Sequence, residues 1–573
     1  MRDRITGAKA LMRALQAEGV KTIFGYPGGA IMPVYDALFD YTRGEKKCFD
    51  HILVRHEQAA THAAEGYARV SGEVGVALVT SGPGATNTMT GVADAMMDST
   101  PMVVIAGQVP ISALGSDAFQ EVDLVGVAQP ISKWSYQIRR AEDIAWAVSR
   151  AFFIARSGRP GPVVLDFSRN AQVEEVEWEP KKVDFVRSYV PYPQLDPEAV
   201  RQAADLINNA RQPLALVGQG VELGNAQEEL REFLEKADIP AGRTMLGLSA
   251  LPSNHPLNVG MLGMHGNYAV NLKEQECDVL IAIGMRFSDR VTGNLKTYAR
   301  QAKIIHLDID RSEIDKNVKT DVAVVADCKE SLPAITALLY KNKHQKWRDS
   351  FRELDEKERV KVIQPAIHPT SGPLLMGEVV NGVAEQAPDD TVLVTDVGQN
   401  QLFATRYFKF HHQRSLCTSG GLGTMGFGYG AAIGTKFGVP EAKVIHITGD
   451  GSFHMNMNEA CTAVSNDLQV ITVIMDNKVL GMVHQWQNLF FNQHYMETEP
   501  GRRTDYKKVI EGFGGHGFEG DTPENFRKAL EEALTIQGPS WIRCPIDPDE
   551  FVLPMIPAGK TVEDIVVSEE DLY

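Results

Sequence analysis

Short apolar runs alternate with helical patterns along residues 1–170. Ala8, Leu11, Met12 and Leu15 fall on one face of a helix, and Gly19 follows as a stop signal. A second, alanine-rich helix is predicted from about residue 57 to 68. The runs that predict buried strands lie at 20–24, 51–54, 74–80 and 102–106. This alternation predicts a doubly wound parallel sheet of the α/β class.

The same alternation occurs twice more along the chain. Strands are predicted at 214–217, 279–283 and 304–309, and again at 444–448 and 470–475. Residues 171–195 are acidic, contain proline and lack periodicity, which predicts a linker. Residues 341–365 form a second, charged and partly helical connector that is expected to end at Pro365. We therefore expect three α/β domains, at 1–175, 195–345 and 370–573.

Composition narrows the class of protein. A chain of 573 residues is too long for one core, and its formal charge of −17 without dense Lys/Arg clusters argues against nucleic-acid binding. Six scattered cysteines without CxxC spacing predict reduced thiols in a cytoplasmic protein. The N-terminus, Met1-Arg2-Asp3-Arg4, shows no apolar signal core, and we expect no membrane span.

Polar residues follow two of the predicted strands. Gly449-Asp450-Gly451 closes the strand at 444–448, and Asn477 closes the strand at 470–475. The carboxyl ends of parallel strands meet at one edge of a sheet, where open α/β folds bind ligands. Asp and Asn oxygens suit Mg²⁺, which usually shares its shell with phosphates, and glycines let the backbone approach a phosphate. We predict a metal-diphosphate site; a tight glycine turn is the alternative.

Glu57 lies at another junction between a strand and a helix, in Arg55-His56-Glu57-Gln58. A carboxylate withdrawn from water at this place could exchange a proton with a heterocycle near neutral pH. Alternatively, its negative charge only complements the dipole at the first turn of the helix. His56 and His62 are expected to be structural, because no partner with metal-ligand spacing accompanies them.

Several further motifs point to one family. They are FGYPGGA (24–30), RHEQAA (55–60), TSGPGATN (80–87), AFQE (118–121), SGRPGPV (157–163), MLGMHG (261–266), SGGLGTMGFG (419–428), GDGSF (449–453) and GMVHQWQ (481–487). With Glu57 and the GDG…N pattern, the chain resembles the thiamine-diphosphate-dependent enzymes. Within them it is similar to the catalytic subunits of the acetohydroxyacid (acetolactate) synthase family.

The resemblance implies roles for individual residues. Glu57 would hydrogen-bond the aminopyrimidine ring of the cofactor, and Gly29 and Gln120 would line the reacting centre. Asp450, Asn477 and the backbone carbonyl of Val479 would hold Mg²⁺. The other expected contacts to thiamine diphosphate are Pro27, Gly398, Gln399, Asn400, Met425, Gly449, Gly451, Ser452 and Met482. For Met425, which would buttress the bent cofactor, ordinary core packing is the alternative.

Phe119, Arg169 and Trp486 are the substrate residues that the resemblance implies. The flat indole of Trp486 could favour 2-ketobutyrate over pyruvate by contacting one extra methylene; an ordinary surface or core indole is the alternative. Three positions depart from the family pattern. The segment Ser168-Arg169-Asn170 stands where Pro-Lys-Asp is usual. Asn400 stands where a His is usual, and Ser288 replaces an aspartate. These departures concern substrate and FAD affinity rather than the chemistry of the thiamine cofactor.

FAD is the third expected cofactor, beside thiamine diphosphate and Mg²⁺. Gly218-Gln219-Gly220 follows one predicted strand and Asp308 lies in another, as in dinucleotide-binding folds, although the full glycine fingerprint is absent. The resemblance adds Arg286, Arg290, Ile309 and Asp327, and implies an FAD that performs no net redox chemistry. An empty middle domain is the alternative.

The implied reaction decarboxylates pyruvate and joins the remainder to a second pyruvate or to 2-ketobutyrate. The products, acetolactate or acetohydroxybutyrate, lead to valine, leucine and isoleucine. The resemblance implies a homodimer or homotetramer, because two subunits share each active site, and allows a separate small regulatory subunit. The alternatives are another thiamine-diphosphate enzyme, such as a pyruvate oxidase or decarboxylase, and a non-catalytic flavoprotein of the same fold.

Overall fold

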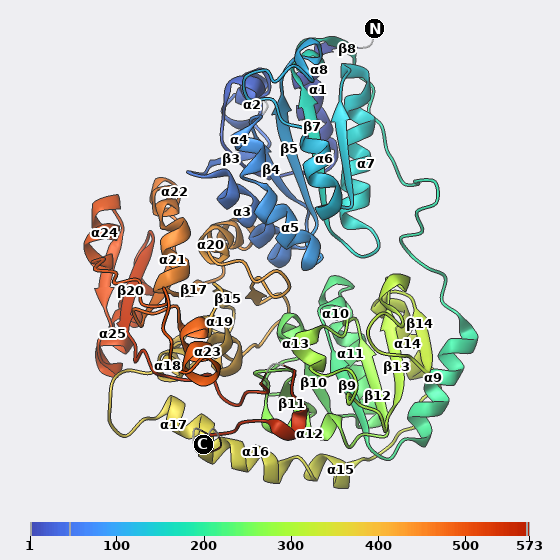
Figure 1. Ribbon diagram of the computed structural model, residues 1–573. Helices are drawn as coiled ribbons and strands as arrows, with labels where there is room; N and C mark the ends of the chain where they lie inside the picture. Colours follow the sequence, from blue (N-terminus) through green and yellow to red (C-terminus); the bar gives the residue numbers. More distant parts are fainter. Residues whose placement is uncertain (1–2, 45–46, 558, 569–570, 572–573) are drawn as a thin grey trace.

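Three six-stranded parallel sheets, each with helices packed on it, follow one another along the chain (Figure 1). The computed structural model describes residues 3–44, 47–557, 559–568 and 571; Met1 and Arg2, part of the segment expected to lack a signal, lie outside them. Separate apolar clusters pack on the two faces of each sheet. The α/β, doubly wound fold class is confirmed.

The N-terminal sheet contains all four strands predicted before residue 110. Its strands, in spatial order, are β3 (Asp50–Leu53), β2 (Thr22–Gly25), β4 (Gly75–Val79), β5 (Met102–Gln108), β7 (Pro162–Ser168) and β6 (Trp134–Ile138). Its helices are α1 (Gly7–Ala17), α2 (Met32–Thr42), α3 (Glu57–Ser71), α4 (Pro83–Thr86), α5 (Met89–Met97), α6 (Leu124–Ala128), α7 (Ile144–Arg156) and α8 (Arg169–Val173). Gly19 follows α1 with a φ of 79°, so its predicted role as a stop is confirmed.

The C-terminal sheet repeats the strand order of the N-terminal sheet. Its strands, in spatial order, are β16 (Leu416–Cys417), β15 (Val392–Thr395), β17 (Val444–Gly449), β18 (Val470–Asp476), β20 (Ser540–Pro545) and β19 (His516–Glu519). Its helices are α18 (Met376–Gln386), α19 (Gln399–Tyr407), α20 (Phe427–Gly438), α21 (Asp450–Asn456), α22 (Ala460–Ser465), α23 (Gly481–Phe490), α24 (Tyr506–Phe513) and α25 (Pro523–Ala533). Numbered within each sheet, both orders are 2-1-3-4-6-5.

The middle sheet has a different order, 3-2-1-4-5-6, which is that of dinucleotide-binding folds. Its strands, in spatial order, are β11 (Asn258–Met261), β10 (Ala241–Arg243), β9 (Pro213–Val217), β12 (Val279–Ile283), β13 (Lys303–Asp308) and β14 (Val322–Val325). Its helices are α9 (Pro197–Asn209), α10 (Gly220–Leu223), α11 (Gln227–Ala237), α12 (Tyr268–Glu274), α13 (Asp289–Thr292) and α14 (Cys328–Leu338).

The predicted linker at 171–195 is wrong in its first part. β8 (Glu175–Glu177) pairs antiparallel with β1 (Arg4–Thr6), so this acidic stretch forms a small sheet with the start of the chain. The rest of the segment has no helix or strand and runs down one side of the molecule to α9 (Figure 1).

The second connector is helical, as expected, but does not end at Pro365. It contains α15 (Gln345–Asp349), α16 (Arg352–Glu358), a π-helical turn at Arg359–Ile363 and α17 (Gln364–Ile367). Pro365 does not stop the helical path: it is the second residue of α17, which directly follows the π-helical turn. In the described part of the chain, none of the helices is long and apolar enough to cross a bilayer.

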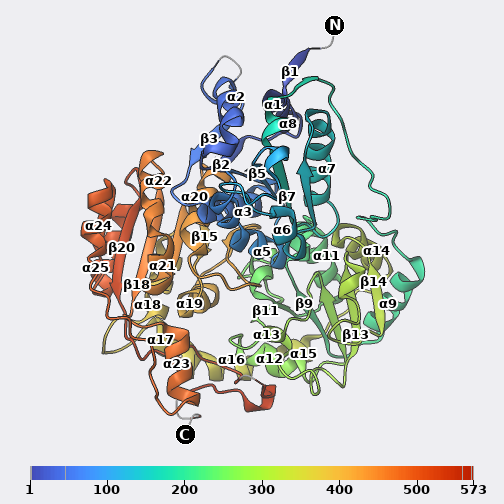
Figure 2. The same ribbon diagram turned by 45° about the horizontal axis from the view of Figure 1, so that its top comes forward.

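Helices α3 and α20 bring the N-terminal and C-terminal sheets together, and both views show them side by side (Figures 1 and 2). Gly430, Gly434 and Gly438 lie one turn apart on α20 and face α3. A Cβ atom added to Gly434 would lie 1.8 Å from the carbonyl oxygen of Ala63, and one on Gly66 would lie 2.0 Å from that of Ala431. Backbone therefore packs directly on backbone at this crossing.

Candidate functional site

The structure places Asp450 and Asn477 at the same edge of the C-terminal sheet. β17 and β18 are neighbouring parallel strands, with Gly449 opposite Met475, so both strands end at this edge. The strand order reverses between β15 and β17, and Gly398 follows β15. Such a reversal is where open α/β sheets bind ligands.

Asp450 is buried, with 1% of its surface exposed. Its Oδ1 atom is buried without a hydrogen-bond partner, whereas Oδ2 accepts a hydrogen bond of 2.8 Å from Nε of Arg502. Burial raises the pKa of Asp450 to about 6, despite the neighbouring Arg502. The oxygen of Asn477 accepts a 3.2 Å hydrogen bond from the N–H of Val479, and its amide donates to Oε1 of Gln399.

This donor set fits Mg²⁺. The unpartnered carboxylate oxygen of Asp450, the amide oxygen of Asn477 and the carbonyl of Val479 are all hard ligands. The surroundings also fit a diphosphate, since Gly398 has a φ of 132° and a Cβ on Gly451 would lie 2.8 Å from the Leu480 side chain. The remaining predicted residues here lie at helix starts: Gln399 and Asn400 on α19, and Ser452 on α21, where its hydroxyl donates to Val397 O at 2.9 Å.

Glu57 lies at the corresponding edge of the N-terminal sheet. It is the first residue of α3, separated from the end of β3 by three residues, and is half-buried. Its Oε2 accepts a 2.9 Å hydrogen bond from the amide of Asn87, while a Cβ on Gly84 would lie 3.3 Å from Oε1. Sequence analysis missed Asn87 as a partner, although it lies within the quoted motif at 80–87. His56 caps α3 through its ring nitrogen, and His62 contacts Glu65.

Other predicted residues of the N-terminal domain lie at the same edge of its sheet as Glu57. Gln120 has a φ of 63°, a strained value for a residue with a side chain, and a Cβ on Gly82 would lie 2.9 Å from its Cα. Arg169 donates a 2.8 Å hydrogen bond to the carbonyl of Gly29, which follows the turn of Pro27. Phe119 is 87% exposed and is not among the residues that line the large cavity described next.

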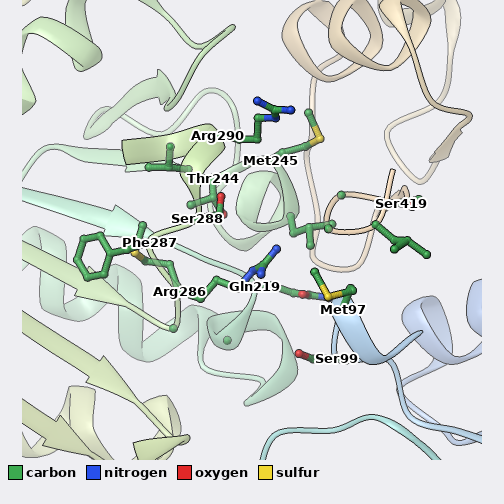
Figure 3. A pocket seen from close by; sticks show the side chains of 18 of the residues that line it. Met97, Ser99, Gln219, Thr244, Met245, Arg286, Phe287, Ser288, Arg290 and Ser419 are labelled. Carbon is green, nitrogen blue, oxygen red and sulfur yellow. The ribbon is translucent and has the colours of Figure 1, made fainter. Parts of the chain in front are cut away.

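A cavity of about 850 Å³ lies where parts of the three sheets' loops converge (Figure 3). Arg286 points across it toward Met97, whereas Phe287 points away and is buried. The predicted FAD residues on its wall are Gly220, Arg286, Arg290, Asp308, Ile309 and Asp327. Four predicted thiamine-site or substrate residues also line it: Gly398, Met425, Met482 and Trp486. Its size is in the range of cofactor pockets.

The reversal of strand order in the middle sheet opens into this cavity. β9 and β12 are neighbours, and a Cβ on Gly218 would lie 2.2 Å from the carbonyl oxygen of Gly284. Only glycine fits this close approach. Burial raises the pKa of Asp308 to about 7, and Asp327 caps α14 by accepting from the N–H of Lys329 at 2.8 Å.

The predicted residues thus fall into three groups within one chain: the Glu57 edge, the Asp450 edge and the cavity. Glu459, which lies just beyond the end of α21, holds the backbone before Glu57: its buried carboxylate accepts hydrogen bonds of 2.9 Å from the N–H groups of Arg55 and His56. Neither Glu57 nor Asp450 lines the cavity. Sequence analysis missed Glu459 and Arg502, since no periodicity marks either position.

Three family models match the chain in order. The thiamine pyrophosphate (TPP, that is, thiamine diphosphate) enzyme N-terminal TPP binding domain matches residues 5–127, and the central domain matches 200–335. The C-terminal TPP binding domain matches residues 396–544. The two cofactor-binding models therefore cover the Glu57 edge and the Asp450 edge.

Relatives match over nearly the full length. A Methanocaldococcus jannaschii protein, described as a "probable acetolactate synthase large subunit", is 45% identical over 98% of this chain and 95% of its own. The Escherichia coli K12 acetolactate synthase isozyme 2 large subunit is 41% identical, over 98% and 99% of the two chains. The isozyme 1 large subunit of that strain is 40% identical, over 99% and 98%. The chain belongs to the acetolactate synthase large subunits, a family of thiamine-diphosphate-dependent enzymes.

Proposed function

We propose that the protein releases CO₂ from one pyruvate and joins the remaining two carbons to a second 2-keto acid. With pyruvate as acceptor the product is acetolactate; with 2-ketobutyrate it is acetohydroxybutyrate. One C–C bond breaks and another forms, so no external oxidant is needed. The observation that carries this proposal is the pair of sheet edges, one with Glu57 and one with Asp450 and Asn477, within a chain of this family.

When bound, thiamine diphosphate supplies a ring that takes up electrons as the carboxylate leaves as CO₂. Asp450, Asn477 and Val479 would hold Mg²⁺ against its diphosphate. Glu57 would hold a proton at the aminopyrimidine ring. The amide of Asn87 already binds Oε2 of Glu57, which leaves Oε1, facing Gly84, as the atom available to the ring.

The substrate residues act by contact and position. Arg169 carries a fixed positive charge suited to a carboxylate, and its bond to the Gly29 carbonyl orients it toward the turn at 27–29. Gln120 and Phe119 would complete the pocket. Trp486 would contact the extra methylene of 2-ketobutyrate, since its indole lines the cavity.

We also propose FAD in the middle domain. The strand order 3-2-1-4-5-6, the glycine contact between Gly218 and Gly284, and the lining residues Arg286 and Arg290 support a dinucleotide. Asp308, Ile309 and Asp327 would contact it. FAD performs no net redox step in the proposed reaction.

For the assembly, we propose a cytoplasmic homodimer or homotetramer in which each site combines Glu57 of one subunit with Asp450 of another. The large-subunit names of the relatives support a separate small regulatory subunit as partner. The biosynthesis of branched-chain amino acids is the proposed pathway. The ranges 1–175, 195–345 and 370–573 remain our proposed domain division.

The test is a product assay of the purified protein with Mg²⁺, thiamine diphosphate, pyruvate and 2-ketobutyrate. Acetolactate and acetohydroxybutyrate are the expected products, and a visible absorption spectrum would reveal bound flavin. Acetaldehyde or hydrogen peroxide without acetolactate would instead identify a decarboxylase or an oxidase and overturn the proposal.

A further inference from the structure

Arg502 contacts the carboxylate that is proposed to bind Mg²⁺. It lies in the irregular segment between α23 and α24. Its Nε donates to Oδ2 of Asp450 at 2.8 Å, and its Nη2 atom lies 2.6 Å from the same oxygen. The two side chains are 13% and 1% exposed. A buried guanidinium therefore already neutralises Asp450.

A guanidinium and Mg²⁺ cannot both hold this carboxylate without strong repulsion. Mg²⁺ requires oxygen lone pairs at about 2.0–2.1 Å in an octahedral shell. Oδ1 of Asp450 has no hydrogen-bond partner, but the other oxygen of the same carboxylate is held by Arg502, so a divalent ion bound to Asp450 would meet that positive charge. Because the pair is shielded from water, this repulsion is poorly screened.

Other cations at this edge have their own partners. Nζ of Lys478 lies 2.7 Å from Asp476, and Nε of Arg543 donates to the same residue at 2.6 Å. Among the described residues, Arg502 is the basic side chain in contact with Asp450. Removing its charge would leave the carboxylate unpaired.

The segment that carries Arg502 is held on both sides. Leu480, next to the predicted ligand Val479, donates its N–H to Thr498 O at 2.8 Å. The Thr504 hydroxyl lies 3.1 Å from Nε2 of His454 on α21. Arg502 itself reaches Asp450 only through its long side chain.

We propose that Arg502 is an internal counter-ion, which holds Asp450 in the metal-free protein and is displaced when the metal binds. The inference rests on the proposed metal role of Asp450. It predicts that Arg502 stabilises the metal-free protein and weakens its affinity for the metal. Metal uptake then exchanges one buried cation for another.

The experiment measures binding of Mn²⁺ alone, by electron paramagnetic resonance, to the full-length protein without thiamine diphosphate. Mn²⁺ accepts the same oxygen ligands as Mg²⁺. Arg502→Gln should bind Mn²⁺ about tenfold more tightly than wild type, because the competing charge is gone while a polar side chain remains. Arg502→Lys, which keeps the charge, should stay near wild type.

Arg503→Gln is the matched control, since Arg503 is adjacent, exposed and forms no ion pair with any residue that the structure describes. It should leave the dissociation constant unchanged. In metal-free protein, Arg502→Gln should also lower the melting temperature, and Mn²⁺ should restore it. Asp450→Asn should abolish Mn²⁺ binding, both alone and combined with Arg502→Gln.

Equal Mn²⁺ affinities for Arg502→Gln and Arg503→Gln would overturn the inference, as would wild-type Mn²⁺ affinity in Asp450→Asn. Acetolactate formation is measured in the same preparations with saturating metal and cofactor. Tighter Mn²⁺ binding without acetolactate production by the wild type would refute the proposed reaction and leave the role of Arg502 standing. If the wild type produces acetolactate normally but Arg502→Gln and Arg503→Gln bind Mn²⁺ equally well, the proposed role of Arg502 is refuted and the proposed reaction stands.

Discussion

The carboxylate of Glu57 is fixed on one side and open on the other. Asn87 binds Oε2, and α3 holds the backbone at its first residue. Replacement by Gln keeps the shape but removes the group that can accept and return a proton. We therefore expect Glu57→Gln to lower the rate of acetolactate formation by about 10²–10⁴-fold, the usual contribution of a general acid–base group.

Glu73→Gln is the control for this variant, because Glu73 is an exposed carboxylate beyond the other end of α3. It should keep the wild-type rate in the same colorimetric acetolactate assay. A Glu57→Gln enzyme with an unchanged rate would exclude Glu57 from the reaction.

Residues at strand ends could be predicted from the sequence, whereas their partners could not. The spacing of the two apolar runs was enough to place Asp450 and Asn477 at one edge, because parallel neighbours end together. Arg502 reaches Asp450 from an aperiodic loop, so no pattern in the sequence marks it. Phe119 is a different case, because the motif predicted it as a pocket residue but it is exposed in the single subunit. Its proposed role therefore depends on what a second subunit adds.

At the scale of elements, the crossing of α3 and α20 depends on glycine. A Cβ on Gly434 would lie 1.8 Å from the carbonyl oxygen of Ala63, so Gly434→Ala forces two backbones apart. We expect a destabilisation of about 1–3 kcal/mol, the usual effect of overpacking. Thermal unfolding should show a lower melting temperature.

Gly512→Ala is the matched control in the exposed helix α24, where an added Cβ would meet nothing within 4 Å. It should raise stability slightly, by about 0.5–1 kcal/mol, since alanine favours a helix. Equal melting temperatures for the two variants would contradict close packing at the crossing.

A buried carboxyl on α12 makes stability depend on pH. Burial raises the pKa of Glu274 from its ordinary 4.5 to about 8, and the Tyr298 hydroxyl donates to it. Between these values the folded state keeps a proton that the unfolded state has released. The free energy of unfolding should therefore fall as pH rises, by about 1.4 kcal/mol per pH unit for one such group.

Glu274→Gln imitates the protonated form and should remove this contribution. As pH rises from about 5 to 8, the free energy of unfolding of the wild type should fall relative to that of the variant, as measured by urea unfolding. Other buried carboxyls, such as Glu550, contribute equally to both proteins. If the unfolding free energies of wild type and Glu274→Gln changed with pH in parallel, Glu274 would be ionised in the folded state.

Long apolar strands were located to within about two residues from periodicity alone, because burial on both faces dictates their composition. β8 was missed for a physical reason. It has three residues, carries two glutamates, and pairs with the start of the chain, so its only signal is a contact distant in sequence. The π-helical turn at Arg359–Ile363 likewise leaves no periodic mark.

At the scale of the whole molecule, the decisive prediction concerns shared sites. If each site combines Glu57 of one subunit with Asp450 of another, mixing the inactive variants Glu57→Gln and Asp450→Ala should restore activity. A mixed dimer has one site with both intact residues and one with neither. After random exchange of subunits, activity should reach about one quarter of wild type.

Each variant alone, taken through the same dissociation and reassembly, is the control and should stay inactive. The acetolactate assay reports the recovery. If both residues of a site came from one chain, every site in the mixture would be defective. Lack of recovery in a mixture that has formed mixed dimers would therefore exclude the shared site.

The glycine contacts between α3 and α20 bear on how the protein can move. Domain interfaces slide when side chains repack, but at Gly66 and Gly434 the backbones of α3 and α20 meet directly, which leaves little room for such repacking. The N-terminal and C-terminal sheets should consequently behave as a single rigid block. Opening and closing around a substrate then falls to the parts joined to that block by irregular chain, above all the middle sheet and the loop after α23.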